Sequence, residues 1–182
     1  MKRSQTQAGF TIIELVVVIL LLGILTATAL PRFIDVTDEA HAAVVDAVEG
    51  GLATGVAMGR AQWFAGNRPT AIPAGDFAPT AVGMSSNGFP SNQAGADVAS
   101  NADCDQVFSD VLQGGRPTTG LETMTGAAPV LADLTYPYVD PFQVMHSAAN
   151  CYYIYVAQGA AFSAPVILYN SSTGEVERGT SL

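Results

Sequence analysis

The sequence is poor in charged residues and in the residue types from which catalytic and metal sites are built. Charged residues make up 13% of its 182 residues, and it has two histidines, two cysteines and one tryptophan. An average soluble domain is about 25% charged. His41 and His146 have no second histidine or cysteine at ligand spacing, and no phosphate loop or nucleophile–base arrangement is evident. We therefore expect no enzyme, no metal site and no cofactor.

Positive charge is especially scarce, and it is unevenly distributed. The chain has 7 Lys and Arg residues against 16 Asp and Glu. Lys2 and Arg3 lie in the first three positions, whereas residues 63–182 include three basic and ten acidic residues. A surface of this sign repels phosphate, so nucleic acid is not an expected partner. Acidic balance alone indicates solubility rather than a particular function.

A long apolar run lies near the N-terminus, from Phe10 to Leu30. Its length is close to the roughly 20 residues that a helix needs to span a bilayer. The basic flank Lys2–Arg3 indicates the cytoplasmic side, so the rest of the chain is expected beyond the membrane. A secretory signal peptide is the alternative, since 27–29 resembles a cleavage site, but its apolar core is usually about 7 to 15 residues long.

The pattern after Pro31 predicts that the helix continues. Apolar residues recur mostly at intervals of four, as one helix face requires. They are Phe33, Ala40, Val44, Val48, Leu52 and Val56. Since Pro31 removes a backbone donor and kinks a helix, we expect one long helix with a bend, from about Phe10 to Trp63. Its first half must pack on lipid or on other copies of the chain.

The remaining residues predict an α+β head with a small antiparallel sheet laid on the second half of the helix. A loop is expected over 66–101 and a short helix over 103–113, and strands are expected over 151–157, 165–169 and 173–177. Gly51, Gly55 and Gly59 form a stripe of small residues that indicates close approach of the sheet to the helix.

The cysteine count bears on the head as well. Cys104 and Cys151 both follow the apolar run. An even number of cysteines in an exported protein indicates a disulfide. A pair of unrelated buried thiols is the alternative if the head is not exported.

The junction between leader and apolar run carries a more specific signal. Residues 2–19 read Lys-Arg-Ser-Gln-Thr-Gln-Ala-Gly-Phe-Thr-Ile-Ile-Glu-Leu-Val-Val-Val-Ile. This run resembles the type IV prepilin signature, in which a hydrophobic helix with a later glycine and proline follows. Here these residues are Gly23 and Pro31, and the resemblance implies that they serve assembly, as Glu14 does. The resemblance implies that prepilin peptidase, a membrane aspartyl protease, cleaves the Gly9–Phe10 bond and methylates Phe10.

The resemblance also implies the organisation of the chain. We expect a leader peptide over 1–9, a transmembrane and assembly helix over 10–30, an amphipathic helix over 31–64 and an extracytoplasmic globular head over 65–182. The expected location is a single-pass protein of the inner membrane with its head in the periplasm, and then an extracellular filament.

Glu14 is the one acidic residue in the apolar run. A carboxylate inside a membrane helix costs about 2.5–3.5 kcal/mol on insertion scales, and such residues are usually paired. Cleavage would create a partner, because the amine of Phe10 has a reference pKa near 7.7–8.0 and is largely protonated at neutral pH. If Glu14 pairs with the amine of a neighbouring copy, a misplaced helix leaves a charge unpaired, and the pairing selects the axial register.

Three further stretches resemble pilins of the mannose-sensitive haemagglutinin (MSHA) type: 31–40, the segment after Cys104, and Cys151-Tyr-Tyr-Ile-Tyr. This resemblance implies a structural subunit that polymerises through its N-terminal helix into a surface filament for adhesion. Its partners are then other pilin subunits, prepilin peptidase, the inner-membrane pilus assembly machinery and, before assembly, the membrane. The alternatives are a pseudopilin of a type II secretion system, and an exported enzyme or receptor tethered by an uncleaved helix.

Overall fold

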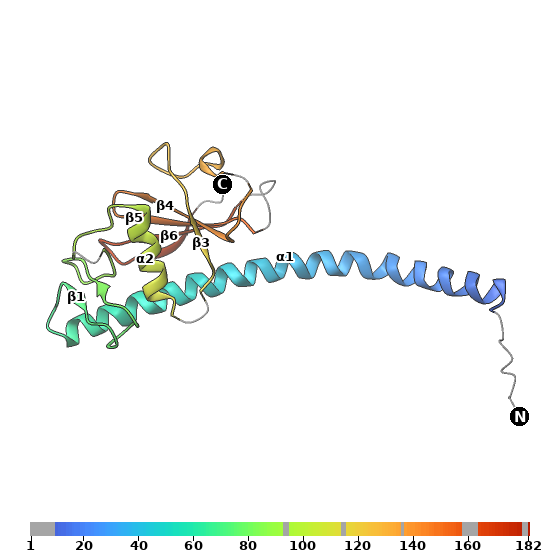
Figure 1. The fold of residues 1–182 in the computed structure, drawn as a ribbon, viewed down its shortest axis with the longest axis horizontal. Helices are drawn as coiled ribbons and strands as arrows, with labels where there is room; N and C mark the ends of the chain where they lie inside the picture. The colour runs from blue at the N-terminus through green and yellow to red at the C-terminus, as the bar shows by residue number, and fades with distance from the viewer. Residues whose placement is uncertain (1–9, 93–94, 114–115, 136, 158–163, 180–181) are drawn as a thin grey trace, which may run out of the picture. The chain divides into compact units, whose positions relative to one another are not determined.

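The computed structural model describes residues 10–182 apart from 93–94, 114–115, 136, 158–163 and 180–181, and gives 30–35 as helix without describing their side chains. The chain divides into two units, Met1–Ala40 and His41–Leu182. Helix α1, Ile12–Ala65, contributes to both (Figure 1). The long N-terminal helix predicted from the sequence is thereby confirmed, whereas the bend at Pro31 stays a prediction.

The unit His41–Leu182 combines the second half of α1 with one further α-helix and two sheets (Figure 1). The remaining elements are β1 (Ala71–Ile72), β2 (Val82–Gly83), α2 (Asn101–Val111), β3 (Thr119–Leu121), the 3-10 turn η1 (Leu131–Asp133), β4 (Phe142–Ser147), β5 (Asn150–Tyr155), β6 (Val166–Asn170) and β7 (Val176–Gly179). Strands β1 and β2 pair with each other, and the larger sheet has the order β3-β4-β5-β6-β7. The predicted α+β fold is confirmed.

Pairing in the larger sheet is antiparallel from β4 to β7, whereas the edge strand β3 runs parallel to β4. Neither β3 nor β4 was predicted from the sequence. In β4 the four residues 142–145 are all buried, so the strand lacks the alternation of apolar and polar residues that marks a half-exposed strand. β3 has only three residues, and its pairing with β4 depends on contacts distant in the sequence.

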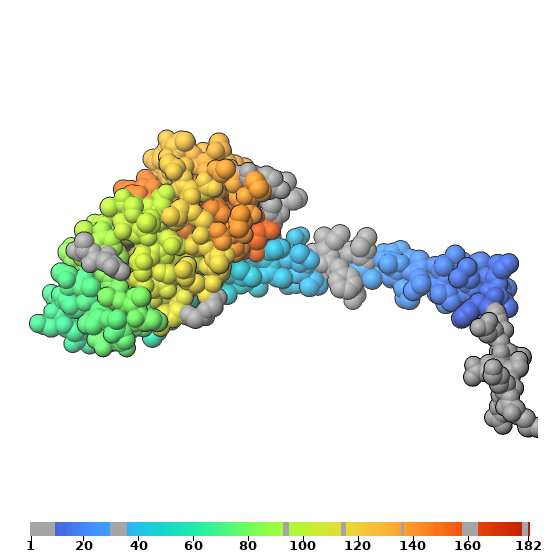
Figure 2. All heavy atoms as spheres, viewed as in Figure 1, coloured from blue at the N-terminus to red at the C-terminus, as the bar shows by residue number. Residues whose placement is uncertain are grey.

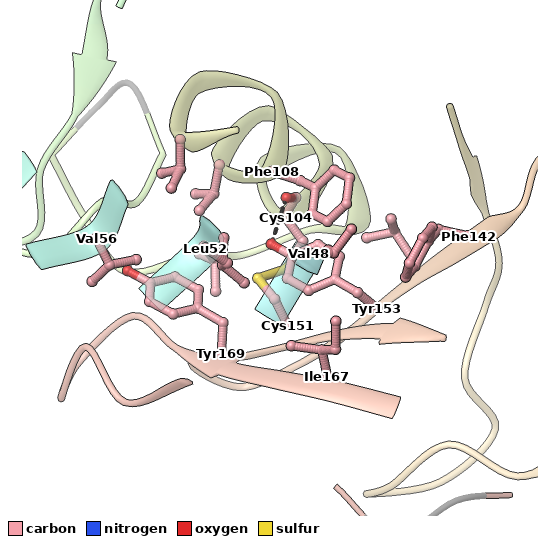
Figure 3. Packing of buried hydrophobic residues seen from close by; sticks show 14 of the residues in the cluster. Val48, Leu52, Val56, Cys104, Phe108, Phe142, Cys151, Tyr153, Ile167 and Tyr169 are labelled. Atoms are coloured by element: carbon pink, nitrogen blue, oxygen red, sulfur yellow. Dashed lines mark hydrogen bonds between the residues drawn. A yellow bond between two sulfur atoms is a disulfide. The ribbon is translucent and has the colours of Figure 1, made fainter. Parts of the chain in front are cut away.

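The main core lies where α1, α2 and the sheet meet, and Figure 3 shows their side chains interdigitating. From α1 it takes Val45, Val48, Leu52 and Val56, which are all buried. Ala40 and Val44 were also expected on this face, but Ala40 is exposed, Val44 is 40% exposed, and Val45 is buried in place of Val44. The spacing from Val45 to Val48 is three residues, which a helix of 3.6 residues per turn uses as readily as four.

The opposite face of the sheet is also covered. Successive side chains of a strand point to opposite faces, so Met145, Ile154 and Val166 lie on the face away from α1. Met124 and Leu134, from the segment between β3 and β4, pack against them. The sheet is therefore the middle layer of the head.

The glycine stripe on α1 marks a close approach, but to α2 and not to the sheet. A Cβ atom at Gly51 would lie 2.9 Å from a side-chain carbon of Leu112, and one at Gly55 would lie 2.4 Å from Val111 Cγ1 and 2.9 Å from its carbonyl oxygen. The predicted approach of the sheet at these glycines is therefore wrong. The C-terminal end of α2 occupies the space that their missing side chains leave.

Candidate processing and assembly site

The first turn of α1 is closed by a reciprocal pair of side chains. The Thr11 backbone N–H donates to Glu14 Oε2 at 2.9 Å, and the Thr11 hydroxyl donates to the same oxygen at 2.7 Å. In return, the Glu14 backbone N–H donates to Thr11 Oγ1 at 3.3 Å. This is a capping box, which satisfies two donors that a helix N-terminus otherwise leaves without a partner. The capping role of Thr11 was not predicted, although the spacing Thr-x-x-Glu before an apolar run indicates it.

The capping box leaves part of the Glu14 carboxylate available. Within the described residues, both hydrogen bonds to the carboxylate use Oε2, and Oε1 has no partner. Phe10 is described and 89% exposed, but its nitrogen belongs to a peptide bond in the uncleaved chain. The structure thus brings Glu14 to Thr11, and pairing with a Phe10 amine stays a prediction. Gly9 lies outside the described residues.

The apolar residues that follow are uncovered. Two stretches of α1 are long and apolar enough to cross a membrane by length and composition: Ile12–Ala29, with mean hydropathy 2.7, and Val36–Ala65, with mean hydropathy 1.2. None of the first stretch is buried, whereas 33% of the second is. The second stretch contributes a face to the head core. Of these two stretches, only the first leaves its whole circumference without a partner among the described residues.

Polar groups inside the first stretch are satisfied locally. The Thr26 hydroxyl donates to the Leu22 carbonyl, and the Thr28 hydroxyl donates to the Leu25 carbonyl at 3.0 Å. Such intrahelical bonds suit a helix in lipid, where water cannot provide a partner. A Cβ atom at Gly23 would meet nothing within 4 Å, so no contact of the monomer requires a glycine there. The roles assigned to Gly23 and Pro31 in assembly stay predictions.

A disulfide joins α2 to β5. Cys104 and Cys151 are bonded with an S–S distance of 2.02 Å and a Cα–Cα distance of 5.5 Å, and both are fully buried. The Tyr153 hydroxyl donates to the Cys104 carbonyl at 2.9 Å, which adds a second link between the same elements (Figure 3). Burial raises the pKa of Tyr153 well above its ordinary value, so this phenol stays protonated in the folded head.

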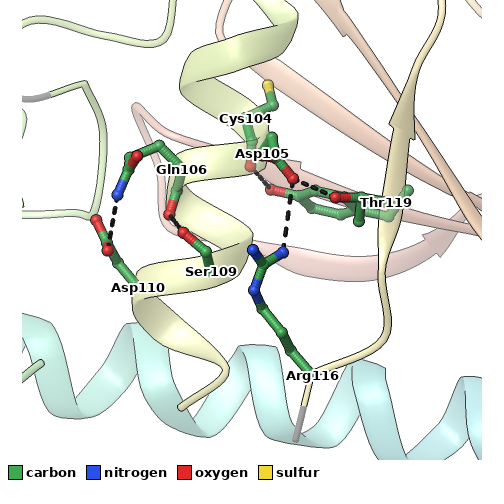
Figure 4. A network of polar contacts seen from close by, with 8 residues as sticks. Cys104, Asp105, Gln106, Ser109, Asp110, Arg116 and Thr119 are labelled. Carbon is green, nitrogen blue, oxygen red and sulfur yellow. Dashed lines mark hydrogen bonds and ion pairs between the residues drawn. The ribbon is translucent and has the colours of Figure 1, made fainter. Parts of the chain in front are cut away.

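The outer surface of α2 is polar and holds the edge strand β3 (Figure 4). Asp105 accepts a hydrogen bond from the Thr119 hydroxyl and forms an ion pair with Arg116 at 3.7 Å. Further along the helix, the Asp110 carboxylate accepts hydrogen bonds from the Gln106 side-chain amide at 2.8 Å and from the Thr80 hydroxyl at 2.7 Å. Both carboxylates are held by contacts within the head, so we assign them a structural role.

The two histidines have separate partners. His41 Nδ1 lies 2.6 Å from the Tyr155 hydroxyl, and His146 Nε2 lies 2.8 Å from the Ala148 carbonyl. In the part of the chain that the structure describes, no group of three or more His, Cys, Asp or Glu side chains is placed to hold a metal ion. The histidines therefore serve local packing in the head.

The arrangement as a whole defines a class of protein: an α+β head, internally crosslinked, whose N-terminal helix is too apolar to remain in water. Comparison with known proteins bears on the family. A family model described as the prokaryotic N-terminal methylation motif matches residues 4–30. The type IV narrow pilus major component PilA5 of Thermus thermophilus is 48% identical over 54 residues, which cover 30% of this chain and 47% of the relative. No solved structure matches.

Both findings support the resemblance of the N-terminal segment to type IV pilins. The matched residues include the Gly9–Phe10 junction and the apolar run that follows it. The match to the relative spans about half of that protein's length. Neither finding concerns the MSHA type, so that closer relationship stays a prediction.

Proposed function

We propose that this chain is the precursor of a structural subunit of a type IV pilus. Prepilin peptidase removes residues 1–9 by cleaving the Gly9–Phe10 bond, and Phe10 is methylated. Ile12–Ala29 holds the subunit in the inner membrane, with the head on the periplasmic side, until the pilus assembly machinery transfers it to the filament. The mature subunit then polymerises through its N-terminal helix with other copies.

The observation that carries this proposal is the unburied apolar surface of Ile12–Ala29, which begins beside a single carboxylate. A soluble monomer rarely exposes a contiguous apolar patch larger than a few hundred Å² unless that surface meets a membrane or another protein. Lipid can cover this helix before assembly, and the same helix of other copies can cover it afterwards. Both environments are apolar, so one sequence serves both states.

Glu14 adds specificity to this packing. Apolar helices slide past one another with little change in contact energy, whereas a buried charge favours the position in which it finds a partner. Since Oε1 of Glu14 has no partner in the described chain, it can accept from the Phe10 amine of a neighbouring copy while Oε2 keeps the capping box. Within this proposal, the charge sets the register and the apolar surface supplies most of the attraction.

The finer assignment is an MSHA-like filament for adhesion and surface attachment. The Thermus thermophilus relative is a type IV narrow pilus major component, which supports a filament subunit rather than a tethered enzyme or receptor. The long loop between α1 and α2 and the Cys104–Cys151 bond support a pilus head. A type II secretion pseudopilin would use the same N-terminal machinery but form a short periplasmic fibre.

Blocking the proposed cleavage tests the function. Gly9→Val is expected to leave full-length precursor in the inner membrane and to abolish filaments. Ala8→Val keeps both residues of the scissile bond, should be cleaved normally and serves as the matched control. Mass spectrometry of the mature N-terminus should find methylated Phe10. Mature protein of normal size from Gly9→Val would contradict the assignment. Imaging with an antibody to the head separates surface filaments from a periplasmic pseudopilus.

A further inference from the structure

Two arginines and three aromatic rings meet at the C-terminal end of α1. The Arg60 guanidinium carbon lies 4.1 Å from the ring centroid of Phe89 and 5.7 Å from that of Phe64. The Arg68 guanidinium carbon lies 5.3 Å from Phe64 and 5.6 Å from Trp63. Phe64, which is 50% exposed, thus lies within cation–π distance of both guanidinium groups. We call Arg60, Phe64 and Arg68 the arginine patch.

This patch has no internal carboxylate partner. Of the four arginine side chains that the structure describes, Arg116 pairs with Asp105 and Arg178 pairs with Asp46 and Glu49. Within the described residues, no carboxylate lies within ion-pair distance of Arg60 or Arg68, and both are exposed. In Figure 2 the end of α1 and the segment that follows it, drawn in green, form one end of the head. The patch is therefore open to a partner.

The same helix carries the opposite charge further toward its N-terminus. Its described acidic side chains after Glu14 are Asp38, Glu39, Asp46 and Glu49, and the sequence has no further acidic residue before Asp76. Asp38 and Glu39 are exposed and, among the described residues, have no cationic partner. These positions lie mid-helix, where the helix dipole does not favour acidic residues. Asp46 and Glu49 are already paired with Arg178, so we call Asp38 and Glu39 the acidic segment.

We propose that the arginine patch of one copy binds the acidic segment of a neighbouring copy in the filament. This inference rests on the proposed function and identifies a second contact, beyond the apolar helix. One surface meets a different surface, so the contact is heterologous; it repeats from copy to copy and yields an open filament rather than a closed dimer. The 21 and 22 residues that separate Glu39 and Asp38 from Arg60 in the sequence set the axial offset of the bound copy.

The composition of the patch suits an interface. Arginine and aromatic residues are enriched among the side chains that dominate binding energy, and Phe64 offers an apolar anchor between two cations. The arginines already lie on rings, so fewer side-chain rotations are lost on binding. A single-stranded nucleic acid could also stack on such a patch. Its phosphates would extend over the acidic remainder of the head, whereas another copy presents its carboxylates in one segment, so we favour the copy.

Charge reversal with rescue tests the contact in cells that carry only the variant subunit. Arg60→Glu with Arg68→Glu is expected to lower filament yield about tenfold or more, and Asp38→Arg with Glu39→Arg to do the same. Combining the four changes should restore the yield to within about twofold of wild type, since each pair meets opposite charge again. Glu175→Arg with Glu177→Arg, two exposed residues outside both surfaces, is the control and should leave the yield unchanged.

Two measurements keep the outcome interpretable. In every variant, cleavage at Gly9–Phe10 and formation of the head disulfide are measured as controls. A wild-type subunit that is neither cleaved nor assembled would contradict the proposed function, not the contact. Because Arg60 packs on the buried Phe89, Arg68→Glu alone, with Asp38→Arg as its rescue, covers the case in which the double variant does not fold. Wild-type yield after reversal, or no rescue by the combined variant, overturns the contact. Normal filaments that have lost retention of single-stranded DNA would assign the patch to a polyanion.

Discussion

The two units of this chain reach a stable state by different means. In His41–Leu182, apolar side chains from α1, α2 and both faces of a five-stranded sheet bury one another, and a disulfide links two of the layers. In the described part of Met1–Ala40, every apolar side chain from Ile12 to Leu25 is exposed, and the side chains of Thr11, Thr26 and Thr28 donate hydrogen bonds within the helix. One unit carries its own core, whereas the other, under the proposed function, forms a core when copies of the helix meet.

Changing Glu14 should have the largest effect of all, because it acts on the unit that depends on other copies. Glu14→Gln keeps the capping box, which accepts either residue, and removes the charge. Cleavage and membrane insertion should persist, while filament yield falls severely and mature subunit accumulates in the membrane. Thr11→Ala, which removes the capping hydroxyl and keeps the charge, is the matched control and should assemble far better. Wild-type filament numbers from Glu14→Gln would show that apolar packing alone sets the register.

Within His41–Leu182, removing the disulfide should cause the largest loss in the free energy of unfolding. It closes a loop with a sequence separation of 47 residues. In the chain-entropy account, such a crosslink contributes about 2–4 kcal/mol to the free energy of unfolding. Cys104→Ala with Cys151→Ala should lower the denaturation midpoint of the detergent-solubilised chain accordingly. A reductant should shift wild type toward the variant and leave the variant itself unchanged; equal midpoints for both proteins would contradict the prediction.

Two glycines of α1 compare a packed helix face with an open one. Gly55→Ala places a Cβ against the Val111 side chain and carbonyl, so we expect a net destabilisation of about 1–3 kcal/mol from overpacking. A Cβ at Gly50 meets nothing within 4 Å. Gly50→Ala should therefore stabilise the helix by roughly 0.5–1 kcal/mol. Thermal unfolding of the two variants measures both signs, and a stabilised Gly55→Ala would show that α2 can move away.

The smallest effect is expected at the ion pairs of Arg178, which connect β7 to α1. Its guanidinium lies 2.6 Å from Asp46 Oδ1 and 2.6 Å from Glu49 Oε2, and hydrogen bonds to these two carboxylates raise the pKa of Arg178 further. The group is partly exposed, so Arg178→Ala should lower the free energy of unfolding by only about 1 kcal/mol or less. The difference should shrink in about 1 M salt, where the screening length is near 3 Å. A larger loss that salt does not change would indicate apolar packing of the side chain.

Features that depend on residues close together in the sequence could be predicted, whereas features that depend on distant contacts could not. The apolar run, Glu14 and the two cysteines are local signals, and they led to the long helix and to the disulfide. The position of β3 is not a local property, because Gly120 lies where a Cβ would be 2.2 Å from the Gln143 side-chain oxygen of β4. The partner of the glycine stripe was also assigned wrongly, since small residues on a helix indicate a close approach without indicating the approaching element. Thr11 was recognisable by its spacing to Glu14 and was missed.

The closed first turn of α1 has a consequence for disassembly under the proposed function. Thr11 and Glu14 satisfy each other within one chain, and Thr26 and Thr28 bond to their own helix. Moving the helix between bilayer and filament therefore requires no exchange of backbone hydrogen bonds, and the transfer is a partition between two apolar solvents. Under the proposed function, a subunit that leaves the filament can therefore re-enter the membrane without breaking the hydrogen bonds of its own helix.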